Sequence, residues 1–124
     1  MRNSGYIEKE WGYEVIWATN DQYCGKLICL THPGNSTSFH FHKNKDKSWF
    51  VNEGKFLLKF IDTTTGETKE TSIKVGDVWN IKANQPHQLI ALEPNSIIFE
   101  VSTDDDSEDI YRIMPAMSYL RSES

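Results

Sequence analysis

Apolar and polar residues alternate along most of this chain, which is the two-residue period of a half-buried β-strand. In the run Lys55–Ile61, for example, Phe56, Leu58 and Phe60 fall on one face. Turn signals rich in Gly, Asn, Asp, Thr and Pro separate such runs at intervals of about eight to twelve residues, so the pattern predicts an all-β sandwich or barrel. The expected strands are 10–17, 23–30, 39–42, 48–51, 55–61, 67–75, 78–81, 87–92 and 97–101.

The end of the chain departs from this pattern. The acidic run 103–109 predicts a solvated loop, since it lacks the spaced ligands and the glycine of a calcium loop. Residues 110–120 predict a short helix or arm, with Tyr111, Met114 and Met117 on its apolar side. We therefore expect one domain over 1–124, with a barrel over about 10–102 and the loop and arm over 103–124.

Composition limits the classes of protein to which this chain can belong. A chain of 124 residues with 38% hydrophobic content can bury one core, and its formal net charge of -5 disfavours nucleic acid as a partner. No apolar run reaches the length of a membrane span, and the N-terminus lacks the apolar core of a signal peptide, so no membrane partner and a cytoplasmic location are expected. Cys24 and Cys29 have opposite parity on one expected strand, which predicts two free thiols.

Two histidines one residue apart form the chemically distinctive stretch. On a β-strand His40 and His42 project to one face while Phe39 and Phe41 project to the other. A third histidine, His87, follows Pro86 much later in the chain. Three neutral imidazoles hold zinc, iron, nickel or copper with water completing the shell, whereas calcium and magnesium prefer oxygen ligands.

The strand after this pair begins near Lys47, and its parity places Lys47, Trp49 and Val51 on one face. We expect Trp49 and Trp79 to belong to the core rather than to a sugar platform, because both lie in mid-strand. Later in the chain, Asn84 stands in a turn, and Asn is the residue that tolerates a left-handed conformation best after Gly.

Motif order then points to a family. Gly34, the His-x-His pair, a strand ending at Gly54, and later Gly76-Asp77 and Pro86-His87 together resemble the two sequence motifs of the cupin superfamily. The resemblance implies a small antiparallel barrel, the double-stranded β-helix, in which His40, His42 and His87 and a glutamate bind one metal ion. In this chain the glutamate position falls on Lys47. Asp46 is one residue off and would reach the site only through a bulge.

A closer resemblance is to the C-terminal domain of type II mannose-6-phosphate isomerases, which also occurs fused to mannose-1-phosphate guanylyltransferase. It rests on Trp11-Gly12-Tyr13-Glu14, the motifs above and Asp109-Ile110-Tyr111-Arg112, and extends from about Glu10 to Ile113. Where those isomerases usually carry Gln, this chain has His40. The resemblance implies a divalent metal that promotes aldose–ketose exchange of a hexose 6-phosphate.

The sequence leaves the function among three classes. The first is a sugar-phosphate isomerase or binding protein of carbohydrate metabolism, with zinc, iron, nickel or manganese as its metal, or with none. Lys47 is then the catalytic candidate, and Lys43, Lys45 and Asp46 are substrate contacts, unless these three form only a solvated turn. The second class, implied by the superfamily, is a three-histidine iron dioxygenase acting on thiols. The third is a sugar or anion-binding protein without catalysis.

Assembly follows from the same resemblance. Cupin-like domains often pair through edge strands, and an uncovered edge is an aggregation hazard. We therefore expect a homodimer that uses either the strand around Trp11–Ile16 or the C-terminal arm.

Overall fold

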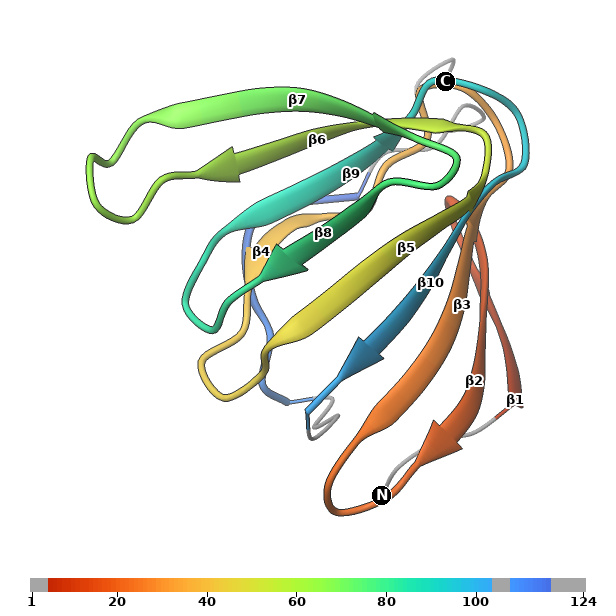
Figure 1. The fold of residues 1–124 in the computed structure, drawn as a ribbon, viewed down its shortest axis with the longest axis horizontal. Helices are drawn as coiled ribbons and strands as arrows, with labels where there is room; N and C mark the ends of the chain where they lie inside the picture. The colour runs from red at the N-terminus through yellow and green to blue at the C-terminus, as the bar shows by residue number, and fades with distance from the viewer. Residues whose placement is uncertain (1–4, 104–107, 117–124) are drawn as a thin grey trace.

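Two antiparallel β-sheets face each other in the computed structural model, which describes residues 5–103 and 108–116 (Figure 1). The first sheet has the strand order β1 (Gly5–Lys9), β2 (Gly12–Thr19), β3 (Cys24–Leu30), β10 (Ser96–Ser102), β5 (Lys47–Glu53) and β8 (Val78–Ile81). The second has the order β11 (Tyr111–Met114), β4 (Phe39–Phe41), β9 (His87–Ala91), β6 (Lys55–Ile61) and β7 (Thr68–Lys74). This arrangement confirms the expected all-β barrel.

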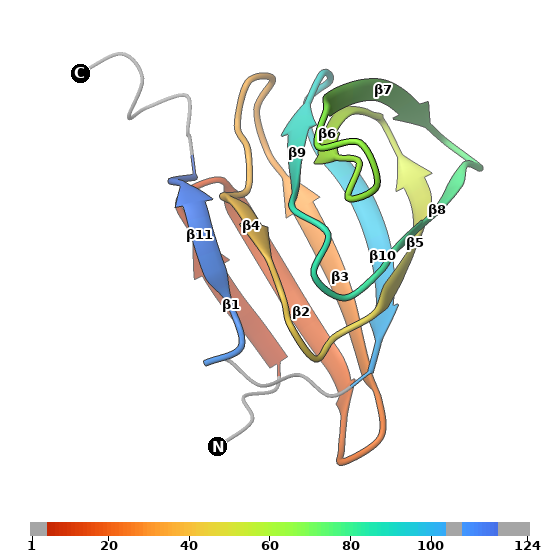
Figure 2. The same cartoon turned by 90° about the vertical axis from the view of Figure 1, so that its left-hand side faces the viewer.

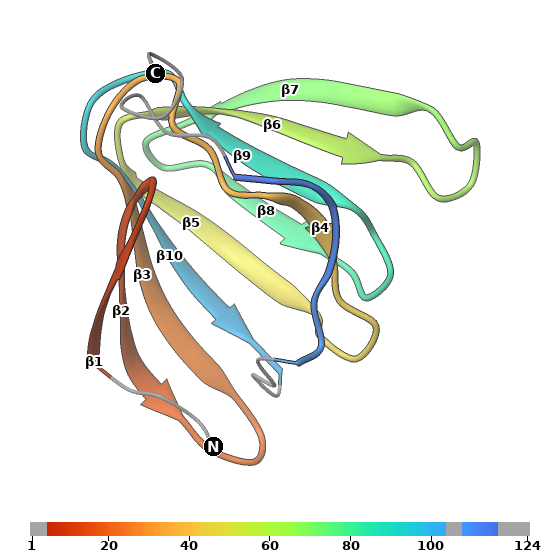
Figure 3. The ribbon, with the colours of Figure 1, turned by 180° about the vertical axis from the view of Figure 1, so that it is seen from behind.

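The two sheets close over a common core. Alternation along β6 buries Phe56 and Leu58 completely, as the sequence predicts, and Val51 of β5 and Ile98 of β10 meet them from the opposite sheet. Each such side chain contributes about 1.5–3 kcal/mol by leaving water. Figure 2 and Figure 3 show the two sheets from the side and from behind, with β11 lying beside β4.

The N-terminal region differs from expectation in its boundaries. Residues 5–9 form β1, a strand that the sequence did not predict, and Glu10 and Trp11 form the turn that leads into β2. The backbones approach closely at Gly12, because a Cβ there would collide with the carbonyl oxygen of Cys29. Asn84 adopts the left-handed conformation that Asn tolerates well, with φ at 67°.

The expected C-terminal helix is wrong for the described part of the arm. Tyr111–Met114 is the strand β11, which pairs with β4, and the ring of Tyr111 stacks on Phe41 at 5.2 Å between centroids. A segment this short cannot offset the cost of helix nucleation, whereas an existing strand edge satisfies its backbone at once. Met117 and most of the acidic run lie outside the described residues.

Two smaller expectations concern cysteines and membranes. Cys24 and Cys29 are both buried and are not joined in a disulfide, as predicted. Within residues 5–103 and 108–116, no helix has the length and apolar character needed to cross a membrane.

Candidate metal centre and its cavity

Three histidines from separate segments converge between the sheets. His40 lies on β4, His42 follows the end of that strand, and His87 opens β9, where it pairs directly with His40. One ring nitrogen of each lies within 4.8 Å of those of the other two, and all three residues are buried. The same-face placement of His40 and His42 predicted from strand parity is therefore what brings them together with His87.

Each imidazole is oriented by a backbone carbonyl. Nδ1 of His40 donates to the carbonyl oxygen of Ser38 at 2.8 Å, Nδ1 of His87 donates to that of Gln85 at 2.8 Å, and Nδ1 of His42 donates to that of Asp109. Because Nδ1 carries the proton in all three rings, the Nε2 lone pairs are left to accept a bond. Nε2 of His87 is buried and has no hydrogen-bond partner among the described residues.

Burial keeps these rings neutral. Burial first, and then the positive charge of Lys47, lower the pKa of His40 to about 3 and the pKa of His42 to about 4. The pKa of His87 is also held well below its ordinary value, first by burial and then by Lys47. A neutral imidazole is the form that binds a metal ion. The donor set, its orientation and its protonation state thus fit a transition metal.

Lys47 occupies the position of the expected glutamate and points inward. Its Nζ atom lies 3.2 Å from Nε2 of His42, to which it donates, and 3.6 Å from Oε1 of Glu100. Burial lowers the pKa of Lys47 to about 8, and Glu100 limits the decrease. The ammonium group of Lys47 therefore competes with a metal ion for His42. At about 4 Å and an effective dielectric near 20, it would oppose a cation by roughly 4 kcal/mol per unit charge.

Glu100 is the carboxylate of this site, and the sequence reasoning missed it. It lies on β10 directly opposite Trp49 of β5, and its Oε1 accepts from Nε1 of Trp49 at 2.9 Å. Its Oε2 lies 3.9 Å from Nζ of Lys45. Burial acts to raise the pKa of Glu100, but Lys47 and Lys45 outweigh it and hold this pKa well below its ordinary range. A signal was present, because Glu100 shares inward parity with Ile98 in an apolar run.

The residues expected to contact substrate are not brought together. Lys45 is buried beside Glu100, but the amino group of Lys43 lies over the ring of Tyr111 at 4.7 Å. The side chain of Asp46 accepts a hydrogen bond from the backbone N–H of Ala83 at 2.6 Å. It therefore stabilises a turn and does not supply the missing metal ligand. Neither Lys43 nor Asp46 lines the cavity described next.

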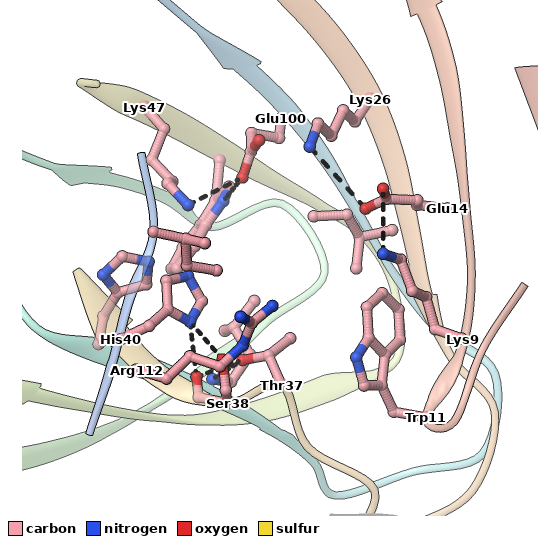
Figure 4. A pocket seen from close by; sticks show the side chains of 15 residues that line it. Lys9, Trp11, Glu14, Lys26, Thr37, Ser38, His40, Lys47, Glu100 and Arg112 are labelled. Atoms are coloured by element: carbon pink, nitrogen blue, oxygen red, sulfur yellow. Dashed lines mark hydrogen bonds and ion pairs between the residues drawn. The ribbon is translucent and has the colours of Figure 1, made fainter. Parts of the chain in front are cut away.

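A cavity of about 140 Å³ lies beside the histidines, and Figure 4 shows the side chains around it. Four cationic and two anionic side chains line it, namely Lys9, Lys26, Lys47, Arg112, Glu14 and Glu100. Glu14 lies 3.8 Å from Lys9 and 3.9 Å from Lys26, and Glu100 is paired with Lys47. The guanidinium of Arg112 has no hydrogen bond or ion pair with any described residue. The cavity is therefore locally cationic on a chain whose net charge is -5.

The tryptophans have structural positions, as predicted. Trp49 is 3% exposed and belongs to the core, although its indole N–H also holds Glu100. Trp79 packs against this core and lies 5.5 Å from the ring of Phe60.

Comparison with known proteins places the chain in a family. A family model described as Cupin matches residues 25–118. The oxalate decarboxylase of Bacillus subtilis, solved at pH 4.6, is 18% identical with a TM-score of 0.78, and a mutant of the same enzyme is 20% identical with a TM-score of 0.78. Each match covers 90% of this chain but only 30% of the solved chain. No curated protein sequence matches the chain.

These matches agree with the geometry of the site. At such identities the solved structures show the fold alone, but the family model covers most of the chain and includes all three histidines. The two facing sheets, the His-x-His pair at the end of β4 and its partner on β9 are arranged as the motifs imply. The chain belongs to the cupin family.

Proposed function

We propose that this chain is a metal-dependent cupin that binds a small anionic substrate between Arg112 and the three histidines. The observation that carries the proposal is the guanidinium of Arg112, which is unpaired among the described residues and lines the same small cavity as His40 and His87. Arg is suited to this task, because its planar donors match the two oxygens of a carboxylate or phosphate. The excess of positive charge around the cavity favours the same ligand class.

The size of the cavity limits which anionic ligands can fit inside it. A volume of about 140 Å³ is close to that of an engineered cavity of about 150 Å³ that holds benzene, so a molecule of roughly six non-hydrogen atoms fills it. Small mono- and dicarboxylates are of this size, and the structurally similar enzyme is named for oxalate. A hexose phosphate is larger and would place only one end inside. The sugar phosphate expected from the sequence is therefore the second candidate, sharing the anionic group.

The chain's own residues supply binding and proton transfer. The Nε2 atoms of His40, His42 and His87 would hold zinc, iron, nickel or manganese, which would polarise an oxygen of the substrate. Arg112 would orient the anionic end. Lys47, placed between His42 and Glu100 and with a pKa of about 8, is positioned to hold or release a proton near neutral pH.

Thermal unfolding tests the binding step. Oxalate, malonate, inorganic phosphate and mannose 6-phosphate are added separately, with and without manganese or zinc. A ligand at 100 times its Kd should stabilise the folded protein by about 2.7 kcal/mol. Arg112→Gln should weaken binding by about tenfold or more, and Arg112→Lys by less, because the charge remains. Lys74→Gln, on an exposed residue of β7, is the matched control and should change nothing.

The outcome also separates the ligand sources. Stabilisation by dicarboxylates alone supports the first candidate, and stabilisation by mannose 6-phosphate supports the second. If none of the anions raises the melting temperature, or if Arg112→Gln binds as well as the parent, the proposal fails. If mannose 6-phosphate binds, an assay for its interconversion with fructose 6-phosphate distinguishes an isomerase from a protein that only binds the sugar phosphate.

The absence of a carboxylate among the three clustered ligands favours one other activity. A three-histidine set is the donor arrangement that the superfamily resemblance associates with thiol dioxygenases, and the nearby Glu100 is paired with Lys47. Oxygen uptake with iron(II) and a thiol such as cysteine tests this second function. Uptake that is unaffected by Arg112→Gln would favour it over the anionic substrate.

A further inference from the structure

The cavity beside the histidines contains a carboxylate that no described residue uses as a hydrogen-bond acceptor. Glu14 lies 3.8 Å from Nζ of Lys9 and 3.9 Å from Nζ of Lys26. Both distances exceed the roughly 2.7–3.2 Å of a hydrogen bond, and no other described residue donates to this carboxylate. Glu14 is nevertheless only 8% exposed. Because buried polar atoms are normally hydrogen-bonded, Glu14 has acceptor capacity left for a ligand that enters the cavity.

An indole N–H that lines the same cavity also lacks a partner. Trp11 is 8% exposed, and its carbonyl oxygen accepts from Asn35 at 3.1 Å, but its Nε1–H donates to no described residue. A buried indole N–H usually finds an acceptor, as Nε1 of Trp49 does on the other side of the site. Trp11 directly precedes β2 and Glu14 lies on it. This part of the wall therefore offers a ligand one donor and one acceptor.

The second sheet contributes the guanidinium of Arg112 from β11, and Figure 4 shows it across the cavity from Glu14. The hydroxyl groups nearby are already used inside the protein. Oγ1 of Thr37 accepts from the backbone N–H of Leu89 at 3.1 Å, and Oγ of Ser38 is hydrogen-bonded to Nδ1 of His40 at 2.9 Å. Any ligand that fills this cavity therefore has to match Arg112 on one side and the Glu14–Trp11 pair on the other.

We propose that the substrate of this site is a small 2-hydroxy acid, with its carboxylate on Arg112 and its hydroxyl between Glu14 and Trp11. This inference rests on the proposed function and narrows its anionic substrate to one class. A hydroxyl donates one hydrogen bond and accepts others, so a single group can donate to Glu14 and accept from Trp11. Lactate and glycolate are of the size that a cavity of about 140 Å³ holds.

Two other ligand classes match these groups less well. The ammonium group of an amino acid would donate to Glu14 but has no lone pair for Trp11. It would also be repelled by Lys9 and Lys26, which lie 3.8 and 3.9 Å from the same carboxylate. A carboxylate without a hydroxyl, such as acetate or oxalate, has no donor for Glu14 at neutral pH. A buried acceptor left without a partner weakens binding.

Calorimetric titration with matched pairs of acids tests the proposal. Lactate is compared with propionate and glycolate with acetate, on the protein as purified and again after metal removal, where chelation by the hydroxyl plays no part. The parent chain should bind each hydroxy acid about tenfold or more tightly than its partner, because hydrogen bonds to a charged acceptor are the strong ones. Glu14→Gln should lower this ratio by about fivefold or more, since its neutral amide oxygen is a weaker acceptor.

The ratio separates the role of Glu14 from its charge. Glu14→Gln also leaves Lys9 and Lys26 without their carboxylate, which strengthens the binding of both acids of a pair and cancels in the ratio. Glu8→Gln makes the same change of charge at an exposed position of β1 and should leave the ratio unchanged. Arg112→Gln should weaken both acids alike, because it acts on the carboxylate that they share.

Several outcomes would overturn the proposal. Equal binding of lactate and propionate by the metal-free parent contradicts it and leaves the proposed function standing, whereas binding of none of the acids contradicts both. A ratio that survives Glu14→Gln, or alanine binding more tightly than lactate, also contradicts it. If circular dichroism shows that Glu14→Gln does not fold, Glu14→Asp decides the matter. It keeps the charge but withdraws the oxygens by one methylene group, so the ratio should fall by about threefold or more.

Discussion

The inner face of β5 passes from a polar region to an apolar one within five residues. At its start Lys47 lies with His42 and Glu100, in a group of buried ionisable side chains. At its end Val51 is fully buried in the core. Both regions are shut off from water by the same two sheets. One strand with a single alternation of inward and outward side chains can therefore support either packing or chemistry, according to the side chain at each inward position.

The two regions differ in what their burial costs. Removing apolar side chains such as Phe56 and Leu58 from water is favourable in itself. Removing Lys47 and Glu100 from water is costly, and their pairing offsets that cost only while both partners are present. The apolar region therefore stabilises the fold. The polar region costs stability, and a functional role of the site explains why it is there. Trp49 lies between them, with its ring in the core and its N–H on Glu100.

The largest expected effect tests the polar region as a coupled pair. Glu100→Gln should lower the free energy of unfolding by about 3–5 kcal/mol, because Lys47 and Lys45 would keep buried charges without their carboxylate. Adding Lys47→Met should restore part of the loss. Leu58→Ala should cost about 2–5 kcal/mol through a cavity, and Lys47→Met should not restore it. Urea unfolding of the single and double variants measures how much stability Lys47→Met restores to Glu100→Gln and to Leu58→Ala. If Lys47→Met restored the same stability to both, the polar and apolar regions would not differ in this respect.

Low pH should reduce the stability that the polar region contributes and leave the contribution of the apolar region unchanged. His42 has a pKa of about 4 in the folded protein against about 6.5 when unfolded, so the unfolded state binds more protons between these values. Stability from this group is complete above pH 6.5 and is lost as the pH falls toward 4, by about 3 kcal/mol. The shifts of His40 and His87 have the same sign.

Unfolding in urea at several pH values, with the metal removed, measures this dependence. The slope of stability against pH should become smaller in His42→Gln, because one of the titrating groups is gone. Leu58→Ala should shift the whole curve without changing its slope, since the apolar region takes up no protons. A parent protein as stable at pH 4.5 as at pH 7 would contradict the neutral burial of the three histidines.

The smallest effect concerns metal affinity. Lys47→Glu should tighten divalent-metal binding by about tenfold or more, or about 1.4 kcal/mol, because it removes the cation bonded to His42 and adds an anionic ligand. Lys47→Met should tighten it less, and His42→Ala should abolish it. Calorimetric titration with zinc or manganese measures these constants without relying on activity.

Leu58→Ala is the control from the apolar region and should leave the metal constant unchanged. Lys47→Glu that binds no more tightly than the parent would show that the ammonium group of Lys47 does not compete with the metal.

The sequence by itself determined the features that depend on parity and backbone conformation. Alternation placed His40 and His42 on one face and Lys47, Trp49 and Val51 on another, because successive strand side chains point in opposite directions. Motif order identified the family and the distant partner His87.

Only the tertiary structure decided which strands became neighbours, and this determined the rest of the site. Glu100 reaches Lys47 because β10 pairs with β5, and Arg112 reaches the cavity because β11 pairs with β4. Local pattern carries little information about such pairings, since any strand edge can satisfy the backbone of another. The carboxylate that pairs with Lys47 thus comes from a neighbouring strand about fifty residues later in the chain, a distance that strand periodicity does not encode.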